Sequence, residues 1–273
     1  MKLRDAEAPA TVPVSSATIM LVRDKAQGTG TEVFMLQRHG KADFGGAHVF
    51  PGGLSADADH TADMAPYCFG LDDVEASRQL GLDAGGLGLW VAAIRECFEE
   101  SGYLMARDIT GALCEPADER HRTRFEDYRE ALAGNALTMR EVCAAESLTL
   151  MCDAIEYVSF WTTPVVFERR YATRFFVAAV PEGQVGAADG RETVDATWVC
   201  PAAAIDPRAE PRLQLHPPTV ENLAWLAGFE SVEATMAAAR ALDKSAIEEV
   251  LPVVSRDSAG MRITLPDGRT ANP

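Results

Sequence analysis

The chain alternates between short apolar runs and longer stretches in which apolar residues recur every three or four positions. The first pattern is typical of buried strands, and the second of helices that bury one face. The apolar runs predict strands at 15–22, 32–37, 155–163, 173–180 and 193–199, and a terminal hairpin at 250–265. The helical pattern predicts helices at 74–80, 86–103, 117–134, 138–147, 217–228 and 231–242.

Strands and helices mixed in this order predict an α/β fold in which a mixed sheet lies between helices. Residues 1–14 are rich in Pro and Ala and are expected to form a tail. A chain of 273 residues that is 47% hydrophobic can bury a large core, so 15–273 is expected to be a single domain. The charged helices at about 115–148 are expected to be an appendage that shapes either a ligand cleft or an oligomer contact.

Composition narrows the class of protein. A formal net charge of -16 argues against a nucleic-acid binder, which needs a basic surface. No stretch approaches the length of a membrane span, and the N-terminus lacks the apolar run of a signal peptide. Six cysteines without CxxC pairing suggest reduced thiols and a cytoplasmic protein. A homodimer is left open, and no membrane or nucleic-acid partner is expected.

The predicted helix at 86–103, GLGLWVAAIRECFEESGY, carries the most specific chemistry of the chain. Glu96, Glu99 and Glu100 stand at positions i, i+3 and i+4, so their three carboxylates share one helix face. Arg95 precedes Glu99 by four residues and can pair with it. Hard oxygen ligands grouped in this way suit Mg²⁺ or Mn²⁺. The alternative is a solvated helix that carries acidic residues on its surface.

The string REcfEEsGy, with FPGG upstream at 50–53, resembles the Nudix box of the Nudix hydrolases. A compact box runs Gly, five residues, Glu, seven residues and then Arg-Glu. Counted from Gly53, the first acidic position of the box falls on Asp59, not a Glu, and 35 residues separate Asp59 from Arg95. A long insertion inside the box resembles the acyl-CoA diphosphatase branch of this family. The resemblance implies a Nudix-type α/β/α sandwich with a mixed sheet and helical insertions.

The same resemblance implies a hydrolase that cleaves a nucleoside diphosphate linked to another moiety, with CoA or acyl-CoA as the first expectation. The products would be 4′-phosphopantetheine and adenosine 3′,5′-bisphosphate. The implied metal ligands are Glu96, Glu99, Glu100 and the carbonyl of Gly53, with Mg²⁺ or Mn²⁺ as the cofactor. Arg95 is expected to orient Glu99. The general base is either Glu96 or the loop residue Glu192.

Phosphate-binding cations are expected at Arg38, Arg169 and Arg170, with Arg174 as a further candidate; the alternative for the pair at 169 and 170 is a solvated loop. The chain departs from the family at Ala172, where Asp is common, and at Ala42, where bacterial CoA enzymes carry Arg. These departures leave ADP-ribose or another nucleotide sugar as an alternative substrate. A non-catalytic module that senses a nucleotide is the alternative from another class, although the complete carboxylate set weighs against it.

The insertion, at about 60–86, carries a predicted helix at 74–80 that Asp72 or Asp73 can cap and that Gly81 ends. Two glycines before Leu87 suggest that the segment leaves and rejoins the box without disturbing the metal site. We therefore expect that a short Gly/Ser loop can replace residues 60–85 in a folded protein.

Overall fold

The structure is a computed structural model, and it describes residues 2–4, 9–40, 45–115, 118–257 and 260–271. Its centre is an eight-stranded sheet in the order β10-β7-β8-β1-β2-β3, with β4 paired to β1 and β9 paired to β2. The strands are β1 (Val14–Asp24), β2 (Thr31–Arg38), β3 (His48–Val49), β4 (Gly52–Leu54), β7 (Glu156–Thr162), β8 (Tyr171–Ala179), β9 (Thr193–Val199) and β10 (Glu249–Val250). The pairs β1–β8 and β7–β10 are parallel and the others antiparallel, so the sheet is mixed.

The side chains of the central strands point alternately to the two faces of the sheet, so the core has two layers. Ile19 and Leu21 of β1 pack into one cluster of buried apolar residues, whereas Met20 and Val22 pack into another. Side chains of a strand point alternately to its two faces, so a continuous apolar run supplies both layers. This explains why β1 shows no polar alternation in its sequence.

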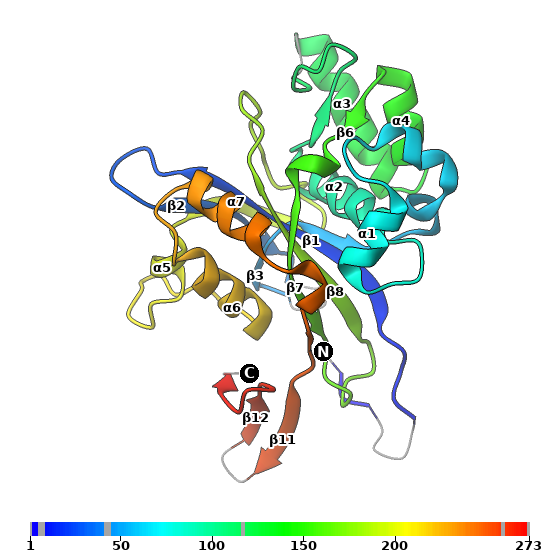
Figure 1. The fold of residues 1–273 in the computed structure, drawn as a ribbon. Helices are drawn as coiled ribbons and strands as arrows, with labels where there is room; N and C mark the ends of the chain where they lie inside the picture. Colours follow the sequence, from blue (N-terminus) through cyan, green and yellow to red (C-terminus); the bar gives the residue numbers. More distant parts are fainter. Residues whose placement is uncertain (1, 5–8, 41–44, 116–117, 258–259, 272–273) are drawn as a thin grey trace.

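Helices cover both faces of the sheet (Figure 1). On one face lie α1 (Asp73–Leu80), α2 (Leu87–Ser101), α3 (Glu119–Ala133) and α4 (Met139–Glu146). On the other face lie α5 (Pro201–Ala204), α6 (Pro217–Leu226) and α7 (Val232–Ala241). The predicted α/β fold with a sheet between helices is confirmed. No helix of the described chain is long and apolar enough to cross a membrane.

The predicted strands and helices each correspond to an observed element, and their ends follow the expected caps. Asp72 accepts from the backbone N–H of Glu75 at the start of α1, and Gly81 ends this helix at φ 64°. Thr138 and Glu141 form a capping box at the start of α4. The sequence did not predict β3 and β4, because their Gly- and Pro-rich residues look like a loop. Pairing with β1 and β2 makes them strands.

The insertion is built into the core, which overturns the expectation that a short loop can replace it. It contains η1 (Asp57–His60), η2 (Ala62–Tyr67) and α1. Met64, Ala76 and Leu80 are buried in the same apolar cluster as α2. The Asp73 carboxylate accepts from the backbone N–H groups of Gly85 and Leu87, both at 2.9 Å. Removing residues 60–85 would therefore uncover the main core and leave the start of α2 without its hydrogen-bond partners.

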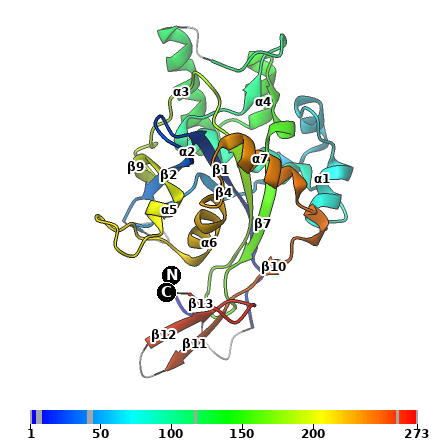
Figure 2. The ribbon, with the colours of Figure 1, turned by 60° about the vertical axis from the view of Figure 1, so that its left-hand side comes forward.

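Two smaller sheets complete the chain. One pairs β5 (Ala106–Arg107) with β6 (Thr149–Leu150) beside η3 (Cys152–Ala154). The other, at the C-terminal end, joins β11 (Val253–Asp257), β12 (Gly260–Thr264) and β13 (Thr270–Ala271), and it follows η4 (Lys244–Ala246). Figures 1 and 2 both place this second sheet beyond one end of the main sheet, beside the loop that joins β7 to β8.

Candidate active site

Helix α2 presents the three glutamates at its C-terminal end. Its apolar residues anchor it against the sheet, and it stops at Gly102, whose φ of 78° suits a residue without a Cβ. Glu96, Glu99 and Glu100 therefore lie in the last turns, and no basic residue stands in the last turn. A helix C-terminus disfavours negative charge, so the position itself favours a bound cation.

Arg95 is the centre of a buried ion-pair network. Its guanidinium donates to both oxygens of Asp59, each at 2.9 Å, and to the carbonyl of Leu54 at 2.7 Å. The Nη1 atom donates to Glu96 at 2.9 Å and to Glu99 at 2.8 Å. Arg95 thus orients Glu99 as expected, and it orients Glu96 as well. Burial alone disfavours the charged guanidinium, but hydrogen bonds to Asp59 and the nearby carboxylates raise the pKa of Arg95.

The glycines of FPGG bring backbone into contact with these carboxylates. Strand β4 pairs Gly53 with Ala17 and Gly52 with Thr18 of β1, which places the loop directly over α2. The backbone N–H of Gly52 donates to Glu100 at 2.9 Å. A Cβ on Gly53 would collide with the Glu96 carboxylate. Glycine is needed at 53 because the carboxylate approaches the backbone so closely.

Burial makes negative charge costly at this end of α2. It raises the pKa of Glu96 to about 7, although Arg95 opposes this shift. It also raises the pKa of Glu99, again against Arg95, and it raises the pKa of Glu100 well above the ordinary value, against the hydrogen bond from Gly52. Asp59, Glu96 and Glu99 share the single guanidinium of Arg95, and Glu100 accepts from the backbone of Gly52, so the site carries uncompensated acidic groups.

These residues fit a divalent cation. Within the described part of the chain, no three Asp, Glu, His or Cys side chains converge into a ready-made metal site. A single nitrogen of Arg95 donates to both Glu96 and Glu99, and the backbone N–H of Gly52 donates to Glu100. The donor set nevertheless consists of hard carboxylate oxygens, whose desolvated charge a divalent cation would neutralise.

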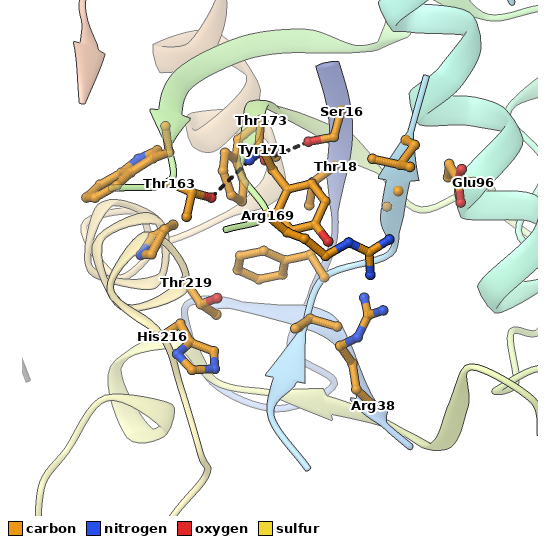
Figure 3. A pocket seen from close by; sticks show the side chains of 18 of the residues that line it. Ser16, Thr18, Arg38, Glu96, Thr163, Arg169, Tyr171, Thr173, His216 and Thr219 are labelled. Atoms are coloured by element: carbon orange, nitrogen blue, oxygen red, sulfur yellow. Dashed lines mark hydrogen bonds between the residues drawn. The ribbon is translucent and has the colours of Figure 1, made fainter. Parts of the chain in front are cut away.

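A cavity of about 1120 Å³ opens beside this network. Of the predicted site residues, Arg38, Gly53, Arg95, Glu96, Glu99, Arg169 and Glu192 line it. Figure 3 shows the guanidinium groups of Arg38 and Arg169 side by side, on the side of the cavity toward Glu96. Glu100 does not line the cavity; it lies behind Gly52, with 4% of its surface exposed.

The structure corrects two of the predicted arginines. Arg170 points away from the cavity and donates to the backbone carbonyls of Thr163, at 2.9 Å, and Thr11, at 2.7 Å. Arg174 also lies outside the cavity lining and stacks over the ring of Phe160, 4.2 Å from its centroid. Arg169, by contrast, lines the cavity.

Glu192 lies at the mouth of the cavity, on the loop before β9. Its side chain is 67% exposed, and its carboxylate is 3.7 Å from the guanidinium of Arg38. Its charge adds to the upward shift of the pKa values of the three buried glutamates, after the larger effect of burial. Glu192 therefore lines the same cavity as Glu96 and Glu99.

Sequence reasoning missed several residues of the site. Asp59, which lies at the acidic position of a compact box, pairs with Arg95 across the whole insertion. The spacing from Gly53 was the available signal, and the long gap to Arg95 obscured it. The end of α3 contributes Leu132, Ala133 and Asn135 to the cavity, so part of the predicted appendage shapes the cleft. Ala172 lies in β8, and position 42 lies outside the described residues.

Comparisons with known proteins agree with this arrangement. A family model described as the NUDT19 Nudix domain matches residues 68–226. The chain is 29% identical over 278 residues to acyl-coenzyme A diphosphatase NUDT19 of Homo sapiens, across 87% of this chain and 71% of that protein. It is 25% identical over 266 residues to the Xenopus laevis protein of the same name, across 86% of this chain and 70% of that protein.

The fold is similar to a solved structure as well. The crystal structure of a NUDIX hydrolase from Alicyclobacillus acidocaldarius aligns with 83% of this chain and 96% of its own, with a TM-score of 0.65 and 25% sequence identity.

Proposed function

Because the chain belongs to the Nudix hydrolases, in the group described by the NUDT19 Nudix domain, we propose that it hydrolyses the diphosphate of CoA or acyl-CoA. The products would be 4′-phosphopantetheine, or its acylated form, and adenosine 3′,5′-bisphosphate. The observation that carries this proposal is the cavity into which Glu96 and Glu99 open together with Arg38 and Arg169. The names of the two diphosphatase relatives support CoA as the substrate class.

The chain's own residues would bind and orient the reactants. Glu96, Glu99 and Glu100, with the carbonyl of Gly53 as a further oxygen, would hold Mg²⁺ or Mn²⁺. When bound, such a cation polarises a diphosphate and lowers the pKa of a coordinated water. Arg95 donates hydrogen bonds to Glu96 and Glu99 and is itself held by its hydrogen bond to Asp59, so it keeps both glutamates in place. Since Glu96 is occupied in this way, Glu192 is the better candidate for the general base.

The guanidinium groups of Arg38 and Arg169 would bind phosphate oxygens. Charge-assisted contacts of this type are short and suit the planar geometry of arginine. Their position between the carboxylates and the rest of the cavity would hold the diphosphate at the metal site (Figure 3).

The proposal is tested by a product assay after treatment with a chelator. We expect CoA to yield the two products only after Mg²⁺ or Mn²⁺ is restored, and we expect ADP-ribose and NADH to react more slowly. Each metal should also raise the Tm of the chelated protein, because a ligand that binds only the folded state stabilises it. Hydrolysis that is unaffected by chelation would contradict metal dependence. Faster turnover of ADP-ribose than of CoA would contradict the CoA assignment.

Arg169 should carry part of the recognition of the phosphates. A lost charge-assisted contact costs about 1.5–3 kcal/mol, or about 10- to 150-fold in affinity. We expect Arg169→Ala to raise KM for CoA within this range. Arg208→Ala is the matched control, because Arg208 is exposed, pairs with Asp206 and lies outside the cavity lining. An unchanged KM in Arg169→Ala would remove Arg169 from the substrate site.

A second substitution tests the general base. Glu192→Gln should lower kcat by about 10²- to 10⁴-fold with little change in KM, because the variant cannot accept the proton of the attacking water. Asp195→Asn, three residues away and outside the cavity lining, controls for lost negative charge. A wild-type kcat in Glu192→Gln would exclude Glu192 as the general base.

The cytoplasmic location and a homodimer also stand as proposals. Six cysteines without disulfide partners support a reducing compartment. Size-exclusion chromatography with light scattering would determine whether the purified chain is a dimer.

A further inference from the structure

The C-terminal sheet contributes apolar side chains to the substrate cavity. In β12, Met261 and Ile263 are two residues apart and therefore share a face, and both line the cavity. On β11, Val254 pairs with Ile263 and Arg256 pairs with Met261, while Ser255 pairs with Arg262 on the other face. Val254 and Arg256 lie outside the cavity lining, so these two strands present Met261 and Ile263 to the cavity. Both residues belong to a sheet separate from the main one.

The side of this sheet that faces the cavity is partly exposed. Met261 is 38% exposed, and Ile263, although only 8% exposed, belongs to neither of the two apolar core clusters. The sheet itself is anchored: Leu265 packs into the core beside α6, and Arg269 donates to both oxygens of Glu221 on α6, at 3.0 and 2.8 Å. The lining is therefore held in place without being filled by the protein's own side chains.

The loop between β7 and β8 faces this sheet and extends the same apolar lining. Pro164 and Phe167 of the loop line the cavity, as does Pro252 just before β11. A backbone bridge between Leu3 and Phe167 holds the loop from outside. Arg170 holds it through the carbonyl of Thr163, which gives a structural reason for an arginine that does not face the ligand. Figures 1 and 2 show this loop and the C-terminal sheet at the same end of the molecule.

Charged and uncharged lining residues occupy different parts of the cavity. Among the described lining residues, the charged side chains are Arg38, Arg95, Glu96, Glu99, Arg169 and Glu192. Figure 3 places Glu96, Arg38 and the guanidinium of Arg169 on one side, opposite Thr163 and Thr219. The lining residues contributed by the C-terminal sheet are uncharged and apolar. A hydrocarbon chain would be stabilised there by the burial of its apolar surface.

We propose that the apolar part of the cavity, lined by Pro164, Phe167, Pro252, Met261 and Ile263, is the acyl-chain subsite, and that the C-terminal sheet sets the preference for chain length. The inference rests on the proposed hydrolysis of CoA and acyl-CoA. Selectivity for the acyl group would thus come from the C-terminal sheet, while cleavage occurs at the glutamates of α2.

The subsite predicts a dependence on chain length. Each methylene that becomes buried should raise kcat/KM by about fourfold until the apolar part is filled. We therefore expect the wild type to prefer octanoyl-CoA to acetyl-CoA, and acetyl-CoA to CoA. The chains should be kept at eight carbons or fewer, so that the substrates remain monomeric in solution.

Two variants of Met261 test the assignment. Met261→Trp fills the subsite, and Met261→Asp places a carboxylate against the chain; each should lower the ratio of kcat/KM for octanoyl-CoA to that for CoA by at least about tenfold. Two different substitutions guard against a folding defect in one of them. Val253→Trp and Val253→Asp are the matched controls, because Val253 is 67% exposed, pairs with Thr264 and lies outside the cavity lining. The controls should leave the ratio within about twofold of the wild type.

The outcomes separate this inference from the proposed function. An equal fall for octanoyl-CoA and CoA in the Met261 variants would overturn the subsite, because this end would then hold the CoA body. An unchanged ratio in both variants would overturn it as well. Wild-type hydrolysis of CoA without dependence on chain length would overturn the subsite and leave the proposed function standing. Failure of the wild type to hydrolyse CoA would overturn both.

Discussion

Replacing Glu100 by Gln is expected to lower kcat for CoA by at least about 10²-fold while stabilising the metal-free protein. Activity should fall because Gln brings no negative charge to the metal site. Stability should rise because burial makes the ionised carboxylate of Glu100 costly and raises its pKa well above the ordinary value. The amide oxygen of Gln can still accept the hydrogen bond that Gly52 donates to Glu100. Function and stability should therefore change in opposite directions.

The gain in stability should depend on pH in a defined direction. A carboxyl group with a raised folded pKa favours the folded state below its unfolded pKa of about 4.3, and this advantage is lost as the pH rises through the folded pKa. In chelator, the Tm of Glu100→Gln should thus exceed that of the wild type more at pH 8 than at pH 5. Added Mn²⁺ should raise the Tm of the wild type more than that of the variant.

The matched control is Glu75→Gln on α1. Glu75 is a surface glutamate outside the cavity, and its carboxylate accepts from Arg78 at 2.7 Å. Hydrogen bonds from Arg78 and Gln79 lower the pKa of Glu75 to about 2, so its substitution should not stabilise the protein at pH 8. Wild-type kcat in Glu100→Gln would exclude Glu100 from the metal ligands. A lower Tm than the wild type at pH 8 would show that the bond from Gly52 outweighs the cost of burial.

Replacing Arg95 by Ala should lower the free energy of unfolding by about 3–5 kcal/mol. The side chains of Arg95 and Asp59 are 11% and 2% exposed, so removal of the arginine leaves a buried carboxylate without a partner. Glu96 and Glu99 lose their partner at the same time. Chemical denaturation in chelator measures the effect, and kcat should fall with it because two metal ligands lose their orientation.

A double substitution separates the loss of stability from the loss of activity. Arg95→Met with Asp59→Leu removes the charges together, and replacing buried ions by apolar groups of similar volume often restores stability. We expect most of the stability to return while activity stays low. Arg78→Ala, which breaks the exposed pair with Glu75, should change the Tm much less because solvent screens that pair. A loss in Arg95→Ala no larger than in Arg78→Ala would contradict the buried network.

The family of the enzyme could be predicted from short-range patterns in the sequence. The carboxylate spacing of α2, the caps of α1 and α4, and the apolar runs of the central strands depend on neighbours within one helical turn or one pleat. Such relations are present in the sequence itself. The fold class, the glutamates and the pairing of Arg95 with Glu99 were therefore predictable, and the structure contains each of them.

Contacts between residues that are far apart in the sequence were not predictable in this way. Arg169 and Arg170 are equivalent as sequence, but only Arg169 lines the cavity, whereas Arg170 donates to the backbone carbonyls of Thr163 and Thr11. Asp59 reaches Arg95 because the insertion folds back as part of the core. A one-residue change of register exchanges the two faces of a strand, and only the packed sheet determines which face meets the ligand.

The sequence by itself thus determined the α/β class of this protein, its hydrolase family and the glutamates of its box. The tertiary structure alone decided which cations reach the cavity, that the insertion belongs to the core, and that the C-terminal sheet contributes an apolar lining. The physical reason is the distance along the chain over which each interaction acts. Periodicity and capping act between residues a few positions apart, whereas a cavity is lined by side chains that only long-range packing brings together.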